Sequence, residues 1–425
     1  MHETYPRSST VRPWAPIRRA PLLSLLCGGL LLAGVSAAAE WPQFRGPARD
    51  GRSQETGLLT EWPDAGPETL WEVAVGGGYS GIAVAGGRVF TLSAEQAGEE
   101  LIAWDAKTGR ELWRYATDRN RPDGEGGGPR STPTVVGDTV YAISAFGKLH
   151  AVDAAEGAAR WSVDLVRDLN GVVPDWGYAS SPLVLGDTLY VETGGGKGNG
   201  VTALDRHSGT VLWRGGDDVS AYSSPQVVEF GGVPQLISFG GGAITSLDPS
   251  TGDTLWKLSW QTRYGVNVAM PLLVSPELLL VSSGYNVGGM MIQGRVEDGV
   301  LSISQAWRTQ RLRTTYASVV AHDGAVFGFD SYFLRCLDAE SGKELWNVRR
   351  TAGSILYADG HLLVVDGGGQ LFLAEASRKG WVQKGKAKIL RGRTWNAPAL
   401  ADGVLYARSL NALVALRVGA VSPAP

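Results

Sequence analysis

The sequence predicts an all-β protein, an eight-bladed β-propeller built from four-stranded antiparallel blades. Three observations support this prediction. An eleven-residue motif ending in tryptophan returns along the chain, tryptophans recur every 39 to 52 residues from Trp71 to Trp346, and hairpin dipeptides separate the apolar runs within the intervals. A four-stranded blade takes about 40 to 50 residues, so each interval has the length of one blade.

The repeated motif predicts a tight turn between two strands. Its aspartate can accept hydrogen bonds from backbone amides two residues further on, and its glycine supplies the positive φ that closes a hairpin. The tryptophan then lies on the returning strand. The four full copies are Ala103–Trp113, Ala203–Trp213, Ser246–Trp256 and Cys336–Trp346, and a worn copy is Ala151–Trp161.

The tryptophans that follow this rhythm are predicted to dock the outer strands. A buried tryptophan removes about 200 Å² from water, which at ~25 cal/mol/Å² contributes on the order of 5 kcal/mol gross. A structural role is therefore expected, even for Trp307, which keeps the spacing without the motif. The predicted docking residues are Trp71, Trp113, Trp161, Trp213, Trp256, Trp307 and Trp346.

The motif, with a small residue first, glycine seventh and tryptophan eleventh, resembles the tryptophan-docking motif of quinoprotein-type (PQQ-repeat) β-propellers. The resemblance implies that each outer-strand tryptophan locks its blade onto the next. Two groups share this fold: dehydrogenases that carry pyrroloquinoline quinone (PQQ), and BamB-like scaffold subunits of outer-membrane barrel assembly, which carry no cofactor. The segment WPQFRGPARDG, which starts at Trp41, resembles the stretch that precedes the first blade in secreted members.

The two ends of the repeat region predict how the ring closes. The last unit, residues 397–418, is one strand short, while Leu70–Val75 is one strand too many. The N-terminal strand is therefore expected to complete the last blade, which removes the exposed edge. The expected organisation is an export signal over residues 1–39, a lead-in over 40–69, the propeller over 70–418 and a tail over 419–425.

The N-terminus has the features of a signal peptide. Arg18 and Arg19 precede an apolar run from Leu22 to Val35, and three alanines offer a cleavage site before Glu40. Cleavage is expected before Glu40, because the apolar run is shorter than the ~20 residues that a membrane span needs. An uncleaved N-terminal anchor is the alternative. Leu26 before Cys27 argues against lipoprotein processing. The mature protein is then periplasmic or extracellular.

The composition limits the partners of the mature chain. The formal net charge of −3 becomes −6 without residues 1–39, which hold four basic residues and one acidic residue. A mildly acidic chain without a basic stripe is a poor nucleic-acid binder, and none is expected as partner. Cys336 is then the single cysteine, so no intramolecular disulfide is expected. We expect a monomeric propeller whose partner is an envelope or secreted protein.

Polar and aromatic residues precede each innermost strand and are candidates for a binding site. If the ring closes as predicted, they meet at one mouth of the central channel, where propellers bind ligands. The alternative is that they only begin strands and satisfy backbone groups. The candidates are Tyr79, Arg130, Tyr178, Tyr222, Asn267, Tyr316, Trp395 and Asn396.

The resemblance also implies where a cofactor would lie. PQQ would rest in the mouth on a tryptophan, with calcium held by carboxylate and amide oxygens. Trp176, Trp260 and Trp395 are the candidate floors, and Glu192, Asn267 and Asp330 are the candidate calcium ligands. The adjacent cysteine pair of the dehydrogenases is absent, and no residue matches their catalytic aspartate.

Two functions follow from these features. The first is a non-catalytic binding or scaffold module for protein or polypeptide partners in the cell envelope, without cofactor or metal, because no catalytic set assembles in the sequence. The alternative is a PQQ- and calcium-dependent oxidoreductase acting on alcohols or sugars. No catalytic residue is assigned.

Overall fold

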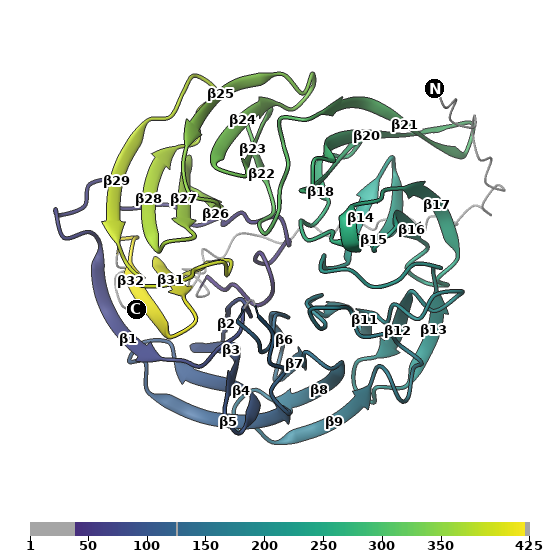
Figure 1. Ribbon diagram of the computed structural model, residues 1–425, viewed down its shortest axis with the longest axis horizontal. Coiled ribbons are helices and arrows are strands. Elements are labelled where there is room, and N and C mark those ends of the chain that lie inside the picture. Colours follow the sequence, from purple (N-terminus) through teal and green to yellow (C-terminus); the bar gives the residue numbers. More distant parts are fainter. Residues whose placement is uncertain (1–38, 125, 421–425) are drawn as a thin grey trace, which may run out of the picture.

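The structure is a computed structural model, and it describes residues 39–124 and 126–420. The predicted export signal therefore lies, except for Ala39, outside the described residues, as does most of the predicted tail. Within these residues, thirty-two strands form eight four-stranded sheets, each antiparallel, and the sheets are arranged in a ring (Figure 1). The predicted eight-bladed β-propeller is confirmed. No helix in the described ranges is long and apolar enough to cross a membrane.

The first four blades follow the chain order. Their strands are β2 (Ala83–Ala85), β3 (Arg88–Glu95), β4 (Gly98–Asp105) and β5 (Glu111–Asp118); β6 (Thr134–Val136), β7 (Thr139–Ile143), β8 (Lys148–Asp153) and β9 (Ala159–Asp164); β10 (Leu183–Leu185), β11 (Thr188–Glu192), β12 (Val201–Asp205) and β13 (Val211–Gly215); and β14 (Gln226–Phe230), β15 (Val233–Phe239), β16 (Ala243–Leu247) and β17 (Thr254–Ser259).

The next three blades repeat this order, and the eighth borrows a strand. Their strands are β18 (Leu272–Ser275), β19 (Leu278–Ser283), β20 (Gly288–Glu297) and β21 (Val300–Thr309); β22 (Val320–His322), β23 (Ala325–Asp330), β24 (Phe333–Asp338) and β25 (Glu344–Arg349); β26 (Gly353–Ala358), β27 (His361–Asp366), β28 (Gln370–Glu375) and β29 (Gln383–Lys388); and β30 (Ala399–Ala401), β31 (Val404–Arg408), β32 (Ala412–Arg417) and β1 (Glu68–Ala74).

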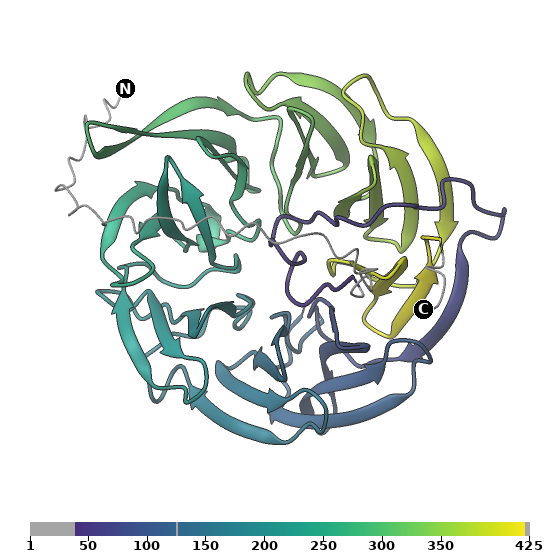
Figure 2. The same ribbon diagram turned by 180° about the vertical axis from the view of Figure 1, so that it is seen from behind.

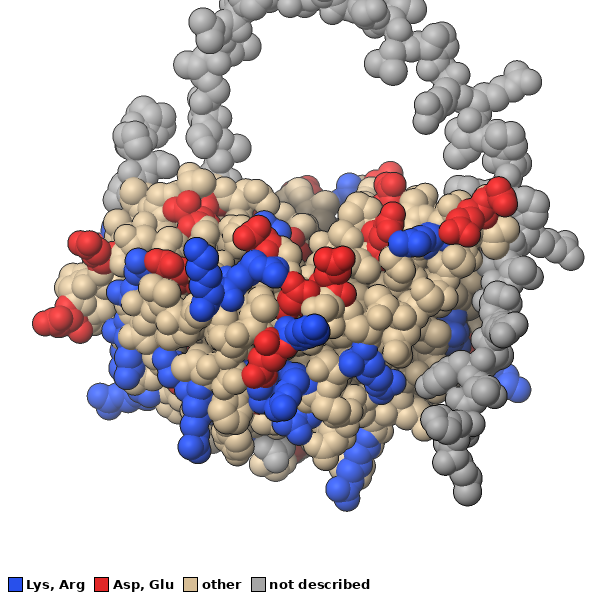
Figure 3. All heavy atoms as spheres, turned by 90° about the horizontal axis from the view of Figure 1, so that it is seen from above, with Lys and Arg blue, Asp and Glu red and all other residues tan. Residues whose placement is uncertain are grey.

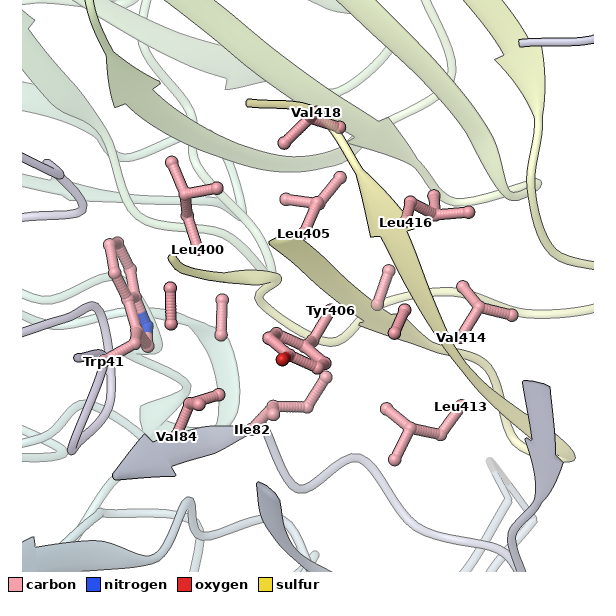
Figure 4. Close-up of a cluster of buried hydrophobic side chains, with 14 of the residues drawn as sticks. Trp41, Ile82, Val84, Leu400, Leu405, Tyr406, Leu413, Val414, Leu416 and Val418 are labelled. Atoms are coloured by element: carbon pink, nitrogen blue, oxygen red, sulfur yellow. The ribbon is translucent and has the colours of Figure 1, made fainter. Parts of the chain in front are cut away.

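The ring closes where the sequence predicted. The strand β1 pairs antiparallel with β32 and becomes the outer strand of the eighth blade, so Trp71 lies opposite Ala415. A buried cluster joins this blade to the first one (Figure 4), and Trp41 of the lead-in caps it at 2% exposure. In Figure 4, Tyr406, Leu413 and Ile82 lie between the two blades. The first and last parts of the chain therefore share one hydrophobic core.

The motif turns adopt the predicted geometry. The Oδ1 atom of Asp105 accepts hydrogen bonds from the backbone amides of Lys107 and Thr108 and from the Thr108 hydroxyl. These bonds lower the pKa of Asp105 below its usual value, with the Thr108 hydroxyl as the largest cause. Gly109 follows with φ +70°, a left-handed conformation that favours glycine.

Six docking tryptophans each connect a blade to the one that follows it. The indole N–H of Trp71 donates to the carbonyl of Ala106 at 2.9 Å, and a Cβ on Gly109 would come within 2.8 Å of the indole. Glycine therefore lets the ring lie flat on the neighbouring turn. The same indole-to-carbonyl bond joins Trp113 to Ala154, Trp161 to Arg206, Trp213 to Pro249, Trp307 to Ala339 and Trp346 to Ser377.

Trp256 departs from this arrangement. Its indole N–H donates to the side-chain oxygen of Gln235, which belongs to its own blade. The next blade lacks the motif, and its third and fourth strands, β20 and β21, are ten residues each and form a long hairpin instead. The seventh blade also has no docking tryptophan on β29, and there Trp62 of the lead-in packs against Gly385 instead.

The lead-in closes one end of the channel, and Figure 2 shows it crossing the centre of the ring. Trp41 pairs with Val84 of β2, and the amide of Ser53 donates to the carbonyl of Tyr357 in β26. Further contacts reach the turns that follow the innermost strands, such as Glu55 accepting from the amide of Gly403. The lead-in thus lies at the far end of the innermost strands, opposite the loops that precede them.

The two faces of the disc differ in charge. Motif aspartates such as Asp105 and Asp338 occupy the turns between third and fourth strands, whereas Arg121, Arg130 and Arg393 lie in loops before innermost strands. In the edge-on view of Figure 3, Lys and Arg dominate the lower half of the visible surface and Asp and Glu are most frequent in the upper half. The visible outer surface therefore differs in charge between its two halves.

Candidate functional site

The central channel contains a cavity of about 250 Å³. The loops before the innermost strands form its walls, and the lead-in closes its base through Trp41, Phe44, Arg45 and Gly51. No Asp or Glu side chain is among the described residues that line it. Among the sequence-predicted residues, the cavity is lined by Tyr79, Arg130, Trp176, Tyr222, Tyr316 and Trp395.

Trp395 is the centre of a stack of flat groups on one wall. Its indole lies 4.4 Å from the Tyr316 ring with an interplanar angle of 10°, and 5.4 Å from the Tyr79 ring with an angle of 21°. The Arg393 guanidinium lies 4.4 Å from the indole centroid and donates to the Tyr79 hydroxyl at 3.1 Å. Such stacks bind planar or apolar groups, and the cation adds electrostatic attraction.

The opposite wall combines Trp176, Tyr222 and Arg130. The Trp176 and Tyr222 rings meet edge to face at 5.7 Å, and the Trp176 amide donates to the Tyr222 hydroxyl. Burial raises the pKa of Tyr222 to about 12, so this hydroxyl stays protonated. Arg130 donates to the Trp176 carbonyl at 2.8 Å, pairs with Asp123 and lies 4.9 Å from the Tyr79 ring centroid. Arg130 is thus held in place between the two walls.

Three predicted site residues do not line the cavity. Tyr178 is fully buried and donates to the carbonyl of Thr193, and Asn396 donates to the carbonyl of Ser80. Asn267 is fully buried, where its amide donates to Gly240 and its oxygen accepts from Ser283. The hydrogen bonds that these three side chains make all go to the protein itself, as in the alternative that the sequence left open, and the Oδ1 of Asn396 is buried without a hydrogen-bond partner among the described residues.

The residues suggested for a calcium ion do not fit such a site. Glu192 is fully buried, its Oε1 accepts from Ser238, and burial raises its pKa to about 8, so it is protonated at neutral pH. Asp330 is held between two arginines, Arg313 and Arg335. Calcium needs several carboxylate or carbonyl oxygens around one point. Within residues 39–124 and 126–420, no three His, Cys, Asp or Glu side chains lie close enough to hold a metal.

Of the three tryptophans suggested as a floor for the cofactor, two line the cavity and one does not. Trp176 and Trp395 line the cavity. Trp260 is 2% exposed, packs against Phe239 and donates to the Ser283 hydroxyl, away from the cavity lining. A flat ring system could rest on the aromatic walls of this cavity, but the described residues place no set of calcium ligands beside it.

The rim of the cavity contains tyrosines that the sequence reasoning missed. Tyr264 and Tyr285 are 62% and 41% exposed, beside Tyr316 at 48%. Tyr264 and Tyr285 have φ values of +68° and +53°, and their rings meet edge to face at 6.4 Å. A bulky residue with positive φ is uncommon and strained. The clue in the sequence was a tyrosine inside a turn, as in Tyr264-Gly265.

Sequence and structure comparisons place the chain among known proteins. It matches the family described as outer membrane protein assembly factor BamB over residues 63–127, 119–332 and 303–422. A search of curated protein sequences found no match.

Similar solved structures share the fold at low sequence identity. The BamB structure from Moraxella catarrhalis has a TM-score of 0.61 and 17% identity, covering 83% of this chain and 99% of that one. The quinohemoprotein alcohol dehydrogenase from Comamonas testosteroni has a TM-score of 0.61 and 13% identity, covering 91% and 82%. The quinohemoprotein alcohol dehydrogenase ADHIIG from Pseudomonas putida HK5 has a TM-score of 0.63 and 14% identity, with the same coverage. The fold, the docking tryptophans and the matched sequence ranges together identify this chain as a member of the PQQ-repeat β-propeller family described as outer membrane protein assembly factor BamB.

Proposed function

We propose that this protein is a non-catalytic binding module of the cell envelope that holds an extended segment of a partner polypeptide at the open mouth of its channel. The export signal predicted over residues 1–39 and the family description support the envelope location. The observation that carries the proposal is the cavity itself. It is closed at one end by the lead-in, open at the other, and lined by aromatic and arginine side chains.

The side chains around the mouth have the composition of a protein-binding surface. Tyrosine, tryptophan and arginine are enriched among the residues that dominate binding energy at interfaces. The exposed Tyr264, Tyr285 and Tyr316 form an apolar rim that a partner can cover, and Arg130 lines the cavity as a hydrogen-bond donor. The narrow cavity excludes a folded domain, so the part of the partner that enters must be extended.

Photo-crosslinking from the rim tests this proposal. A benzoylphenylalanine placed at Tyr316 should capture a polypeptide in envelope preparations, because this residue lies on both the wall and the rim. The matched control is the same group at Leu212, which is 53% exposed on the outer strand β13. Capture at the rim but not at the control supports the proposal. Equal capture at both sites, or capture at neither, contradicts it.

The alternative function is a PQQ-dependent oxidoreductase acting on alcohols or sugars. The stack of Tyr316 on Trp395 favours it, because a planar ring system can rest on such a surface. PQQ would supply the redox chemistry, and Arg130 and Arg393 would be the candidate partners for its carboxylates. The unmet requirement for calcium ligands places this function second. Dye-linked oxidation of alcohols or aldoses by the protein reconstituted with PQQ would reverse that order.

A further inference from the structure

Arg45 lies at the closed end of the cavity and is 5% exposed. Its Nε donates to the carbonyl of Arg49 at 3.2 Å, and its Nη2 donates to the carbonyls of Asp50 at 2.7 Å and Val319 at 2.5 Å. Its Nη1 has no hydrogen-bond partner among the described residues. Two N–H groups of a buried guanidinium are therefore available to a ligand in the cavity.

The charge of Arg45 is also unpaired within the described ranges. Asp50 attracts it electrostatically but forms no ion pair with it, and burial lowers the pKa of Arg45 to about 10, which leaves it protonated at neutral pH. Arg49 is 3% exposed nearby, and the one carboxyl group close to it, that of Glu192, has a pKa raised to about 8 by burial, which favours its uncharged form. A buried charge without a counterion is costly, and an anionic ligand would offset this cost.

The backbone that presents Arg45 is strained. Arg45 and Arg49 have φ values of +65° and +57°, in the left-handed region that side chains other than glycine rarely adopt. Gly46 and Gly51 beside them also have positive φ, and a Cβ on Gly46 would come within 2.9 Å of Trp41. Strain of this kind persists where the surrounding structure requires it and is concentrated at ligand sites.

We propose that the closed end of the cavity binds the C-terminal carboxylate of the partner polypeptide. The chain end enters through the rim, its carboxylate accepts hydrogen bonds from the Nη1 of Arg45, and its last side chain rests on Tyr316 and Trp395. Tyr264 and Tyr285 then contact the residues that precede the end. A ligand that covers this rim must be longer than the cavity, which favours a polypeptide over a small free acid. This inference rests on the proposed function.

Binding of a peptide pool as free acid and as amide tests the inference. The probe is a fluorescein-labelled pool of hexapeptides, random at the first five positions and tryptophan at the last, and the readout is fluorescence anisotropy with the mature protein. The amide lacks the negative charge, so the free acid should bind at least about tenfold more tightly, which corresponds to 1.4 kcal/mol. Because this comparison uses the unchanged protein, it does not depend on how any variant folds.

Two variants assign the difference to Arg45. Arg45→Gln should abolish the preference for the free acid, whereas Arg110→Gln, an exposed arginine in a motif turn, should retain it. If Arg45→Gln fails to fold, Arg45→Lys keeps the charge with a shorter reach and should reduce the preference. Equal binding of acid and amide overturns this inference and leaves the proposed function standing. Binding of neither overturns both, and phenylacetate binding as tightly as the peptides shows a small-acid site and also overturns the inference.

Discussion

Replacing Trp71 with alanine should weaken the closure of the ring by a measurable amount. The side chain is 8% exposed, lies flat on Gly109 of the first blade and donates to the carbonyl of Ala106 at 2.9 Å. A fully buried tryptophan replaced by alanine costs about 3 to 5 kcal/mol. The lost hydrogen bond, worth about 1 kcal/mol, leaves a carbonyl without its donor. The expected loss is about 4 to 6 kcal/mol.

Thermal unfolding followed by circular dichroism measures this loss. The unfolding entropy of about 2.1 cal/mol/K per residue, over roughly 380 residues, gives about 0.8 kcal/mol/K, so Tm should fall by about 5 to 8 °C. Trp71→Phe keeps most of the apolar contact and should cost about 1 kcal/mol, hence 1 to 2 °C. The control Leu212→Ala, at a half-exposed residue of β13, should change Tm by less than about 1 °C. A Trp71→Ala protein as stable as this control would refute the docking account.

Three further perturbations follow from the same structure. Gly157→Ala should lower the unfolding free energy measured in urea by about 2 kcal/mol or more, because its φ is +73° and the new Cβ would come within 2.7 Å of Trp113. Gly137→Ala, with φ +60° but no atom within 4 Å of the new Cβ, should cost about half as much. Burial raises the pKa of Glu192 to about 8, so its contribution to stability is full below pH 4.5 and is lost as the pH rises through 8. Glu192→Gln should therefore flatten the decline of the unfolding free energy measured from pH 5 to 9. An unchanged slope would contradict the raised pKa of Glu192. Asp330→Asn should lower the unfolding free energy by about 3 to 5 kcal/mol, because it leaves Arg313 and Arg335 facing a neutral side chain. A loss below about 1 kcal/mol would show that the ion pairs of Asp330 with these arginines are solvated.

The sequence predicted the fold because the repeat carries its own geometry. The aspartate, glycine and tryptophan of each motif specify a turn, a positive φ and a docking contact, and five copies agree. The missing fourth strand of the eighth blade could be inferred by counting, because a propeller without closure would leave an exposed edge. The predicted closing strand Leu70–Val75 corresponds to β1 at Glu68–Ala74. Local chemistry and global topology gave the same answer here.

The candidate site was predictable only in part, because the orientation of a side chain depends on the tertiary structure. Tyr316 and Trp395 line the cavity, but Asn267, in the equivalent loop of another blade, turns into the core to bond Gly240 and Ser283. A position in a loop does not decide this, since either orientation satisfies the amide. The position of Arg45 in the cavity lining could not be predicted either. The lead-in has no repeat with which to compare it, and its contacts with the channel join residues far apart in the sequence.

Calorimetric titration of the mature protein tests the central claim most directly. One titration uses PQQ with calcium, and the other uses a synthetic copy of the segment captured from the rim at Tyr316. A binding module predicts saturable heat with the peptide, lost in Trp395→Ala, and no calcium-dependent binding of PQQ. Saturable, calcium-dependent binding of PQQ, together with no heat from the peptide, would contradict the account and establish the cavity as a cofactor site.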